Sequence, residues 1–88
     1  MYQVVPFVMI TNADIATRFL MAIDALYATG EVVRFTHLER EMGINHSMLY
    51  RLRKDPTRQL HPRWLAYLVD RYAVNADWLL LGRGRMFM

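Results

Sequence analysis

The side chains best suited to chemistry in this chain of 88 residues gather between Asn45 and Arg58. Amide, imidazole, hydroxyl, phenol and guanidinium groups follow one another there, and such groups form hydrogen bonds with base edges in the DNA major groove. Other basic side chains suit phosphates, which position a protein on DNA without specifying its sequence. We predict that bases are read by Asn45, His46, Ser47, Tyr50 and Arg51. We predict that phosphates are held by Arg34, Arg53, Lys54 and Arg58.

A helix over residues 46–54 would present these side chains on one side. At about 100° per residue, Met48, Leu49 and Leu52 fall within one apolar arc, and Ser47, Tyr50, Arg51 and Lys54 fall opposite it. One face is therefore predicted to pack on a core while the other enters the major groove. The competing interpretation is an ordinary solvated face, which is also polar.

The turn before this helix favours the DNA interpretation. Gly43 permits a positive φ, which ends the preceding helix. Asn45 is predicted to cap the next helix, with its side-chain oxygen accepting a backbone N–H. Ile44 and Leu49 have the spacing of a hydrophobic staple, which fixes the angle at which that helix leaves the turn. Residues 35–54 thus predict a helix-turn-helix.

Two helices are predicted ahead of the turn. The first runs from about residue 13 to 28, and Thr11 or Asn12 can cap it. The second begins near Thr36, which fits a capping box with Glu39 three residues later.

Two more helices are predicted after residue 61. Pro62 lies in the first turn of one, where a missing N–H costs nothing. Asn75 caps the other, a short helix that Gly82 closes. The longer helix has an apolar stripe of Leu65, Leu68, Val69, Tyr72 and Ala73. In the short helix, the residues expected to turn inward are Trp78, Leu79 and Leu81. Trp64 and Trp78 are expected to pack in the core or at an interface, with a partly exposed position at a dimer interface as the alternative for Trp64.

Residues 1–10 form an apolar segment ahead of a single domain at residues 11–88. The segment fits an extended arm, an edge strand or a tail, and its abrupt change of composition raises the hypothesis that the natural start is Met9. Its apolar run, residues 4–10, is too short to span a bilayer and lacks the basic residues of a signal peptide. We therefore expect a cytoplasmic protein without a membrane partner.

The charge distribution favours a polyanionic partner. Residues 1–45 hold three basic and five acidic side chains, whereas residues 46–88 hold eight basic and three acidic. Ten of the eleven basic residues are arginine, whose rigid guanidinium pairs with phosphate and guanine. Codon composition is the alternative explanation for the arginines.

No catalytic, cofactor or metal site is expected. The chain has no cysteine, and His37, His46 and His61 are 9 and 15 positions apart, without the close pairs that zinc sites use. Ser47 is the single serine, and His46 beside it points about 100° away on a helix, which is unsuited to activating a nucleophile.

The turn and its flanking helices resemble the helix-turn-helix of phage-repressor and Cro-like (Xre-type) transcriptional regulators. That pattern has apolar residues five places before the turn glycine, just before it, and twice in the second helix, occupied here by Leu38, Met42, Leu49 and Leu52. Residues 74–84, VNADWLLLGRG, resemble the v-x-x-x-W-L-L-x-G-x-G close of small regulators of this class. The position after Leu38 is usually small in the family, and we interpret Glu39 there as the capping-box partner. The likeness covers about residues 13–87.

The resemblance implies a five-helix lambda-repressor-like fold and a homodimer that binds operator double-stranded DNA to regulate transcription. The alternative is a protein-interaction module, antitoxin-like or an adaptor, that keeps this fold. The apolar N-terminal segment and the Met and aromatic content would suit a protein partner. A small-ligand sensor is a third option, for which five short helices leave little room.

Overall fold

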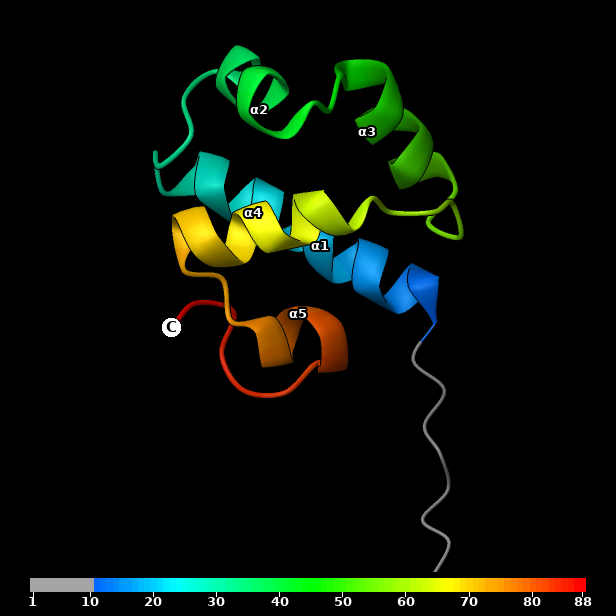
Figure 1. Ribbon diagram of the computed structural model, residues 1–88, viewed down its shortest axis with the longest axis vertical. Coiled ribbons are helices and arrows are strands. Elements are labelled where there is room, and N and C mark those ends of the chain that lie inside the picture. Colours follow the sequence, from blue (N-terminus) through cyan, green and yellow to red (C-terminus); the bar gives the residue numbers. More distant parts are fainter. Residues whose placement is uncertain (1–10) are drawn as a thin grey trace, which may run out of the picture.

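Five α-helices make up most of residues 11–88, the part of the chain that the computed structural model describes (Figure 1). They are α1 (Asn12–Ala28), α2 (Phe35–Met42), α3 (His46–Lys54), α4 (Pro62–Tyr72) and α5 (Ala76–Leu81). Within these residues, strand-like pairing is limited to one isolated bridge between Val74 and Phe87. The all-α prediction is therefore confirmed. The predictions for residues 1–10, including a start at Met9, fall outside the described residues.

The helix α1 begins at a reciprocal cap. The Thr11 hydroxyl accepts from the Asp14 N–H at 3.2 Å, and the Asp14 carboxylate accepts from the Thr11 N–H at 3.1 Å. These hydrogen bonds lower the pKa of Asp14. Phe19, Ile23 and Leu26 follow at helical spacing and are buried. The predicted first helix and its Thr11 cap are confirmed, with a start one residue earlier.

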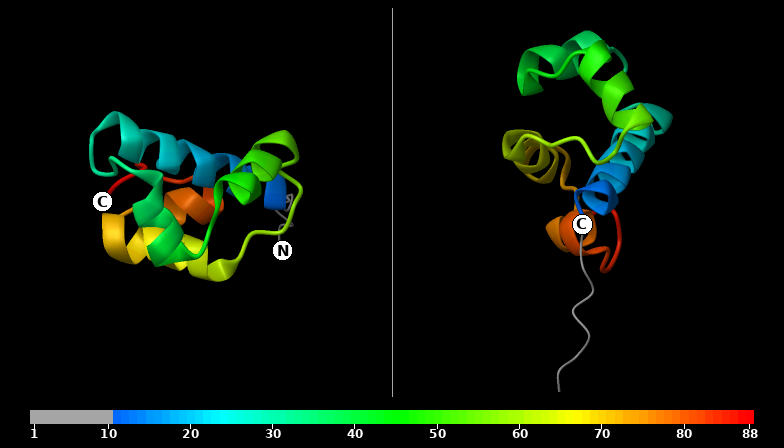
Figure 2. Two further views of the ribbon diagram at one scale, coloured as in Figure 1. Left: turned by 90° about the horizontal axis from the view of Figure 1, so that it is seen from above. Right: turned by 90° about the vertical axis from the view of Figure 1, so that its right-hand side faces the viewer.

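The helix α1 lies between the other elements. It contacts α3 on one side and α5 on another, while α2 packs on α4. Figure 2 shows α2 and α3 together at one end of the domain, α1 and α4 below them, and α5 at the opposite end. Arg18 fastens α5 to α1 by donating from Nε to the Leu79 carbonyl oxygen at 2.9 Å and from Nη2 to the Leu80 carbonyl oxygen at 3.1 Å. A cation at these carbonyls also complements the negative end of the α5 dipole.

The core draws residues from all five helices, and it includes Trp64. That side chain is 7% exposed, and its ring stacks near Phe19 with 6.2 Å between centroids. The core position for Trp64 is therefore confirmed and the partly exposed alternative was wrong, because α4 turns this residue toward α1. Nor do the three residues chosen in α5 all point inward. Leu79 is fully buried, Trp78 is half-buried and Leu81 is exposed. Leu79 and Leu81 are two positions apart, so their side chains differ by about 200° around the helix axis and cannot share a face.

The predicted stripe of α4 is rotated in the structure. Trp64 and Leu68, four residues apart, are its buried residues, and three of the five predicted positions are half-buried: Leu65, Val69 and Tyr72. Ala73 lies past the helix end, exposed, with a left-handed φ of 55°. The helix therefore centres its inner face on the tryptophan that the periodicity analysis had left out. No helix among residues 11–88 has the length and apolar character needed to cross a membrane.

Candidate nucleic-acid interface

Three residues join α2 to α3 and set the angle between them. Gly43 has a left-handed φ of 71°, and its N–H donates to the Glu39 carbonyl oxygen at 2.9 Å. Ile44 is buried. The side-chain oxygen of Asn45 accepts from the Met48 N–H at 2.8 Å. The predicted glycine turn, the Asn45 cap and the helix from His46 to Lys54 are confirmed.

The start of α2 differs from the prediction. The helix begins at Phe35 with Arg34 as the preceding residue, and no side chain accepts from its first N–H groups. Thr36 and Glu39 therefore form no capping box. The half-buried Phe35 packs against the core, and this contact extends the helix past Thr36 toward the N-terminus. The interpretation of Glu39 as a capping partner was wrong for the same reason.

The helix α3 separates its residues as its periodicity indicated. Leu49 and Leu52 are buried, and Met48 is half-buried. The residues predicted to read bases are all exposed: Asn45, His46, Ser47, Tyr50 and Arg51. The structure thus brings the five predicted base-reading residues together on the exposed side of α3 and its cap.

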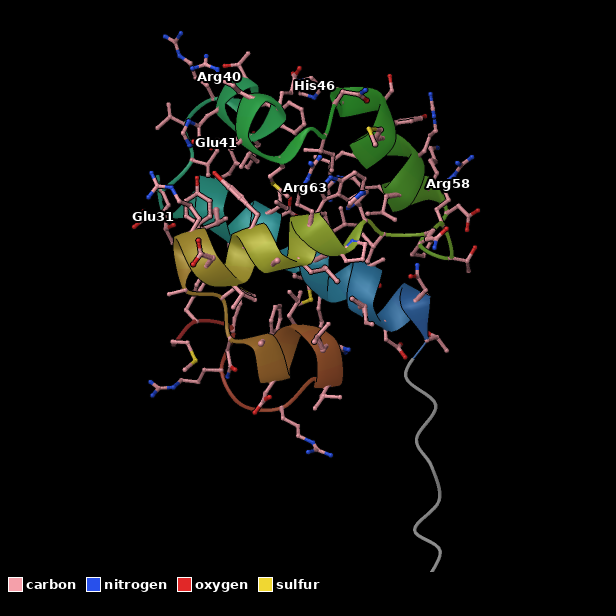
Figure 3. The ribbon with its side chains drawn as sticks, in the orientation of Figure 1. Glu31, Arg40, Glu41, His46, Arg58 and Arg63 are labelled. Atoms are coloured by element: carbon pink, nitrogen blue, oxygen red, sulfur yellow. The ribbon has the colours of Figure 1, made fainter. Side chains whose placement is uncertain are left out.

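Two of these side chains are held by aromatic contacts. The His46 imidazole stacks on the Phe35 ring with 3.9 Å between centroids and 29° between planes. One face of the imidazole is therefore covered, which orients its ring atoms at the start of α3 (Figure 3). Tyr50 is 61% exposed, and the Lys54 ammonium lies 5.4 Å from the centre of its ring. That separation allows a cation–π interaction between successive turns.

The four predicted phosphate-binding residues fall into two groups. Arg53 forms an ion pair with Asp24 of α1, with Nη2–Oδ1 at 2.7 Å and Nη1–Oδ2 at 3.3 Å. Its guanidinium ties the end of α3 to α1 and is already neutralised. The other three are also exposed but form no ion pair among the described residues: Arg34, Lys54 and Arg58. Figure 3 shows Arg58 beside the C-terminal end of α3.

The loop that carries Arg58 is fixed by short-range contacts. Asp55 ends α3, as predicted, and its carboxylate accepts from the hydroxyl and, at 3.1 Å, from the N–H of Thr57. These hydrogen bonds lower the pKa of Asp55. The Asn12 side-chain amide donates to the carbonyl oxygens of Pro56 and Arg58. Arg58 is therefore attached to a backbone that two contacts hold in place.

Arg63 is a further basic residue at this surface that the sequence did not reveal. It is exposed in the first turn of α4, and its Nη2 lies 3.0 Å from the place a Cβ on Gly43 would occupy. Figure 3 shows its side chain reaching from α4 toward the turn between α2 and α3. The His61 ring nitrogen Nδ1 caps this turn of α4 by accepting from the Arg63 N–H at 3.2 Å. Only its charge could have drawn attention to it in the sequence, because Gly43 is twenty positions away.

Two acidic side chains next to α3 are engaged with other groups. Asp24 pairs with Arg53, and Asp55 accepts from Thr57. Glu41, on α2, lies 3.9 Å from the His37 ring. Exposed basic side chains also follow along α3, the next loop and the start of α4: Arg51, Lys54, Arg58 and Arg63. Basic side chains gathered in this way attract anionic groups.

Among residues 11–88, no group of three or more histidine or acidic side chains is placed to hold a metal ion.

Comparisons with models of protein families, with curated proteins and with solved structures returned no match for this chain. Function must therefore be inferred from the residues themselves.

Proposed function

We propose that this protein is a transcriptional regulator that binds double-stranded DNA with sequence specificity, and that α3 enters the major groove. The observation that carries the proposal is the division of α3 into two faces. Leu49 and Leu52 anchor one face in the core, and base-reading side chain types occupy the exposed face. A helix anchored by one face with a polar other face is what major-groove insertion requires.

The proposed contacts divide by position along α3. Asn45, His46 and Ser47 lie at its N-terminal end, where a recognition helix first meets base edges, and Tyr50 and Arg51 follow one turn later. Lys54 and Arg58 lie at or beyond its C-terminal end, and Arg34 precedes α2. These three would hold phosphates, and Arg63 would add a fourth positive charge beside the turn. Arg53 would contact phosphate only by giving up Asp24.

We also propose that the five helices adopt a lambda-repressor-like arrangement and act as a homodimer. The order of the helices, the three-residue turn and the motif over residues 74–84 support this proposal. A dimer of this kind presents two copies of α3 to two half-sites about 10 base pairs apart or a multiple of that.

Selection from a randomised duplex library tests the proposal. The purified full-length protein is incubated with the library at about 150 mM salt, where nonspecific phosphate binding is weakened. Enrichment of an inverted repeat with the expected spacing is the predicted outcome. Recovery of unenriched DNA that salt readily removes would refute sequence-specific binding.

A second candidate function is a protein-interaction module built on the same helices. It is favoured by large apolar side chains that remain exposed on the domain, among them Met21, Val33, Leu80 and Met88. Under this alternative, the purified protein shows no salt-steep, sequence-dependent affinity for DNA and instead co-purifies with one defined protein in stoichiometric amount.

A further inference from the structure

The ion pair between Asp24 of α1 and Arg53 of α3 lies at the edge of the proposed DNA-binding face. Arg53 follows His46 by seven positions, so its side chain leaves α3 about 20° from His46 and about 60° from Tyr50 around the helix axis. These three side chains of α3 also line one hollow between α1 and α3. Arg53 therefore shares a side of α3 with two of the residues proposed to read bases.

In this ion pair the guanidinium holds an anion through both of its terminal nitrogens. Nη2 of Arg53 lies 2.7 Å from Oδ1 of Asp24, and Nη1 lies 3.3 Å from Oδ2. Guanidinium groups bind phosphate through the same two parallel hydrogen bonds. The Asp24 carboxylate thus occupies the place on Arg53 that a phosphate of DNA would take.

Exposure to solvent makes this pair exchangeable. The Arg53 side chain is 45% exposed and the Asp24 side chain is 60% exposed. Among residues 11–88, neither side chain forms a hydrogen bond with any other group. Ion pairs that are open to solvent are weak and are screened by salt. An incoming phosphate, which carries the same sign of charge as the carboxylate, can therefore displace it from Arg53.

Building on the proposed function, we propose that Asp24 competes with DNA phosphate for Arg53 and thereby lowers the affinity of this protein for DNA of any sequence. While the pair is closed its net charge is zero, so Arg53 adds no free positive charge to the face. When Arg53 turns to a phosphate, Asp24 loses its partner and repels that phosphate, which reduces the gain. Phosphate contacts carry no sequence information, so the ratio of specific to nonspecific affinity stays the same.

Replacing Asp24 with asparagine tests the proposal, because the amide keeps the shape of the side chain and removes its charge. Binding of the full-length variant to a random-sequence duplex, and to the duplex that selection enriches, is titrated between about 50 and 200 mM salt. Each added phosphate contact steepens the dependence of log affinity on log salt by about 0.9. Asp24→Asn should bind both duplexes more tightly than the wild type, and its advantage should shrink about 3.5-fold over this range of salt.

Asp70→Asn is the matched control for net charge. Asp70 is exposed near the C-terminal end of α4, and that end of α4 lies away from α3 (Figure 1). This variant gains the same charge but should steepen the salt dependence much less. In a chain that already carries Arg53→Ala, Asp24→Asn should have no larger effect than Asp70→Asn, because the group for which Asp24 competes is gone. Circular dichroism checks that each variant is folded, and Asp24→Ala provides a second variant if Asp24→Asn is not.

Two results would overturn the proposal while leaving the proposed function intact. Equal effects of Asp24→Asn and Asp70→Asn would reduce the role of Asp24 to net charge. Weaker binding by folded Asp24→Asn would show instead that the ion pair orients Arg53 toward DNA. Failure of the proposed function gives a different result, because selection then enriches no sequence while the random-sequence duplex still reports on Asp24. No binding of either duplex by the wild type and by Asp24→Asn at the lowest salt would refute both proposals.

Discussion

Replacing Gly43 with alanine is expected to lower the free energy of unfolding by about 1–2 kcal/mol. Gly43 has a φ of 71°, and an L-residue in this left-handed region brings its Cβ close to the following carbonyl oxygen, at a cost of about that size. The new Cβ would also lie 3.0 Å from Nη2 of Arg63. That atom is the end of a long, flexible side chain, so we expect it to move aside at little cost.

Gly30 provides the matched control for this prediction. It has a φ of 80°, and a Cβ built on it meets no other heavy atom within 4 Å. Gly30→Ala therefore measures only the free-energy cost of placing alanine in the left-handed backbone conformation. The two variants should be destabilised to a similar extent. Gly43→Asn should lose less, because asparagine tolerates the left-handed region better than alanine.

Thermal unfolding followed by circular dichroism measures these differences. In a domain of this size, each 1 kcal/mol corresponds to about 4–8 °C in Tm. An unchanged Tm for Gly43→Ala would refute the left-handed turn and, with it, the angle assigned between α2 and α3. A much larger loss than for Gly30→Ala would show instead that Arg63 is rigidly held against the turn.

Three further predictions concern capping, DNA contacts and a buried phenol. Asn45→Ala should lower the free energy of unfolding, measured by thermal unfolding, by about 1 kcal/mol because it removes the cap of α3. Thr36→Ala should leave it unchanged, since α2 has no side-chain cap. On the proposed function, Arg51→Ala should cost about 1–3 kcal/mol and relax preference at one base step. Lys54→Ala should lower the affinity for all DNA sequences alike and flatten the dependence of affinity on salt by about one unit of slope. Binding titrations at several salt concentrations distinguish these two variants. An equal loss of affinity for every sequence in Arg51→Ala would contradict its base-reading role. The Tyr67 hydroxyl is buried without a hydrogen-bond partner among the described residues, so Tyr67→Phe should be as stable as the wild type or more so, and denaturant titration would contradict this by showing a loss. Burial raises the pKa of Tyr67 from its ordinary value of 10.0 to about 12, so the stability that its neutral form contributes is complete below pH 10 and lost as pH rises through 12; Tyr67→Phe should remove that dependence.

Much of the candidate site could be predicted because its determinants are local. The left-handed glycine at position 43, the Asn45 cap and the apolar arc of α3 each depend on residues within one or two helical turns. The same holds for the ends of α5 at Asn75 and Gly82. Rules of propensity, capping and periodicity act over that range, which is why these predictions agree with the structure.

The errors arose where a distant residue decided the local outcome. The capping box at Thr36 is a valid local pattern, but the packing of Phe35 on the core starts α2 earlier. Trp64 follows the polar loop directly, at the start of an apolar run, and its ring is buried beside Phe19 of α1. The stripe of α4 was misplaced because a single helix does not indicate which side its neighbours will cover.

The sequence by itself determined the helices, the turn and which side chains of α3 stay exposed. Tertiary structure alone decided what each basic side chain meets. Arg53 is neutralised by Asp24, twenty-nine positions earlier, while Arg63 is brought beside the turn at Gly43. The physical reason is range: backbone conformation follows from neighbouring residues along the chain. The availability of a charge depends instead on which distant groups the packed helices bring within a few ångströms.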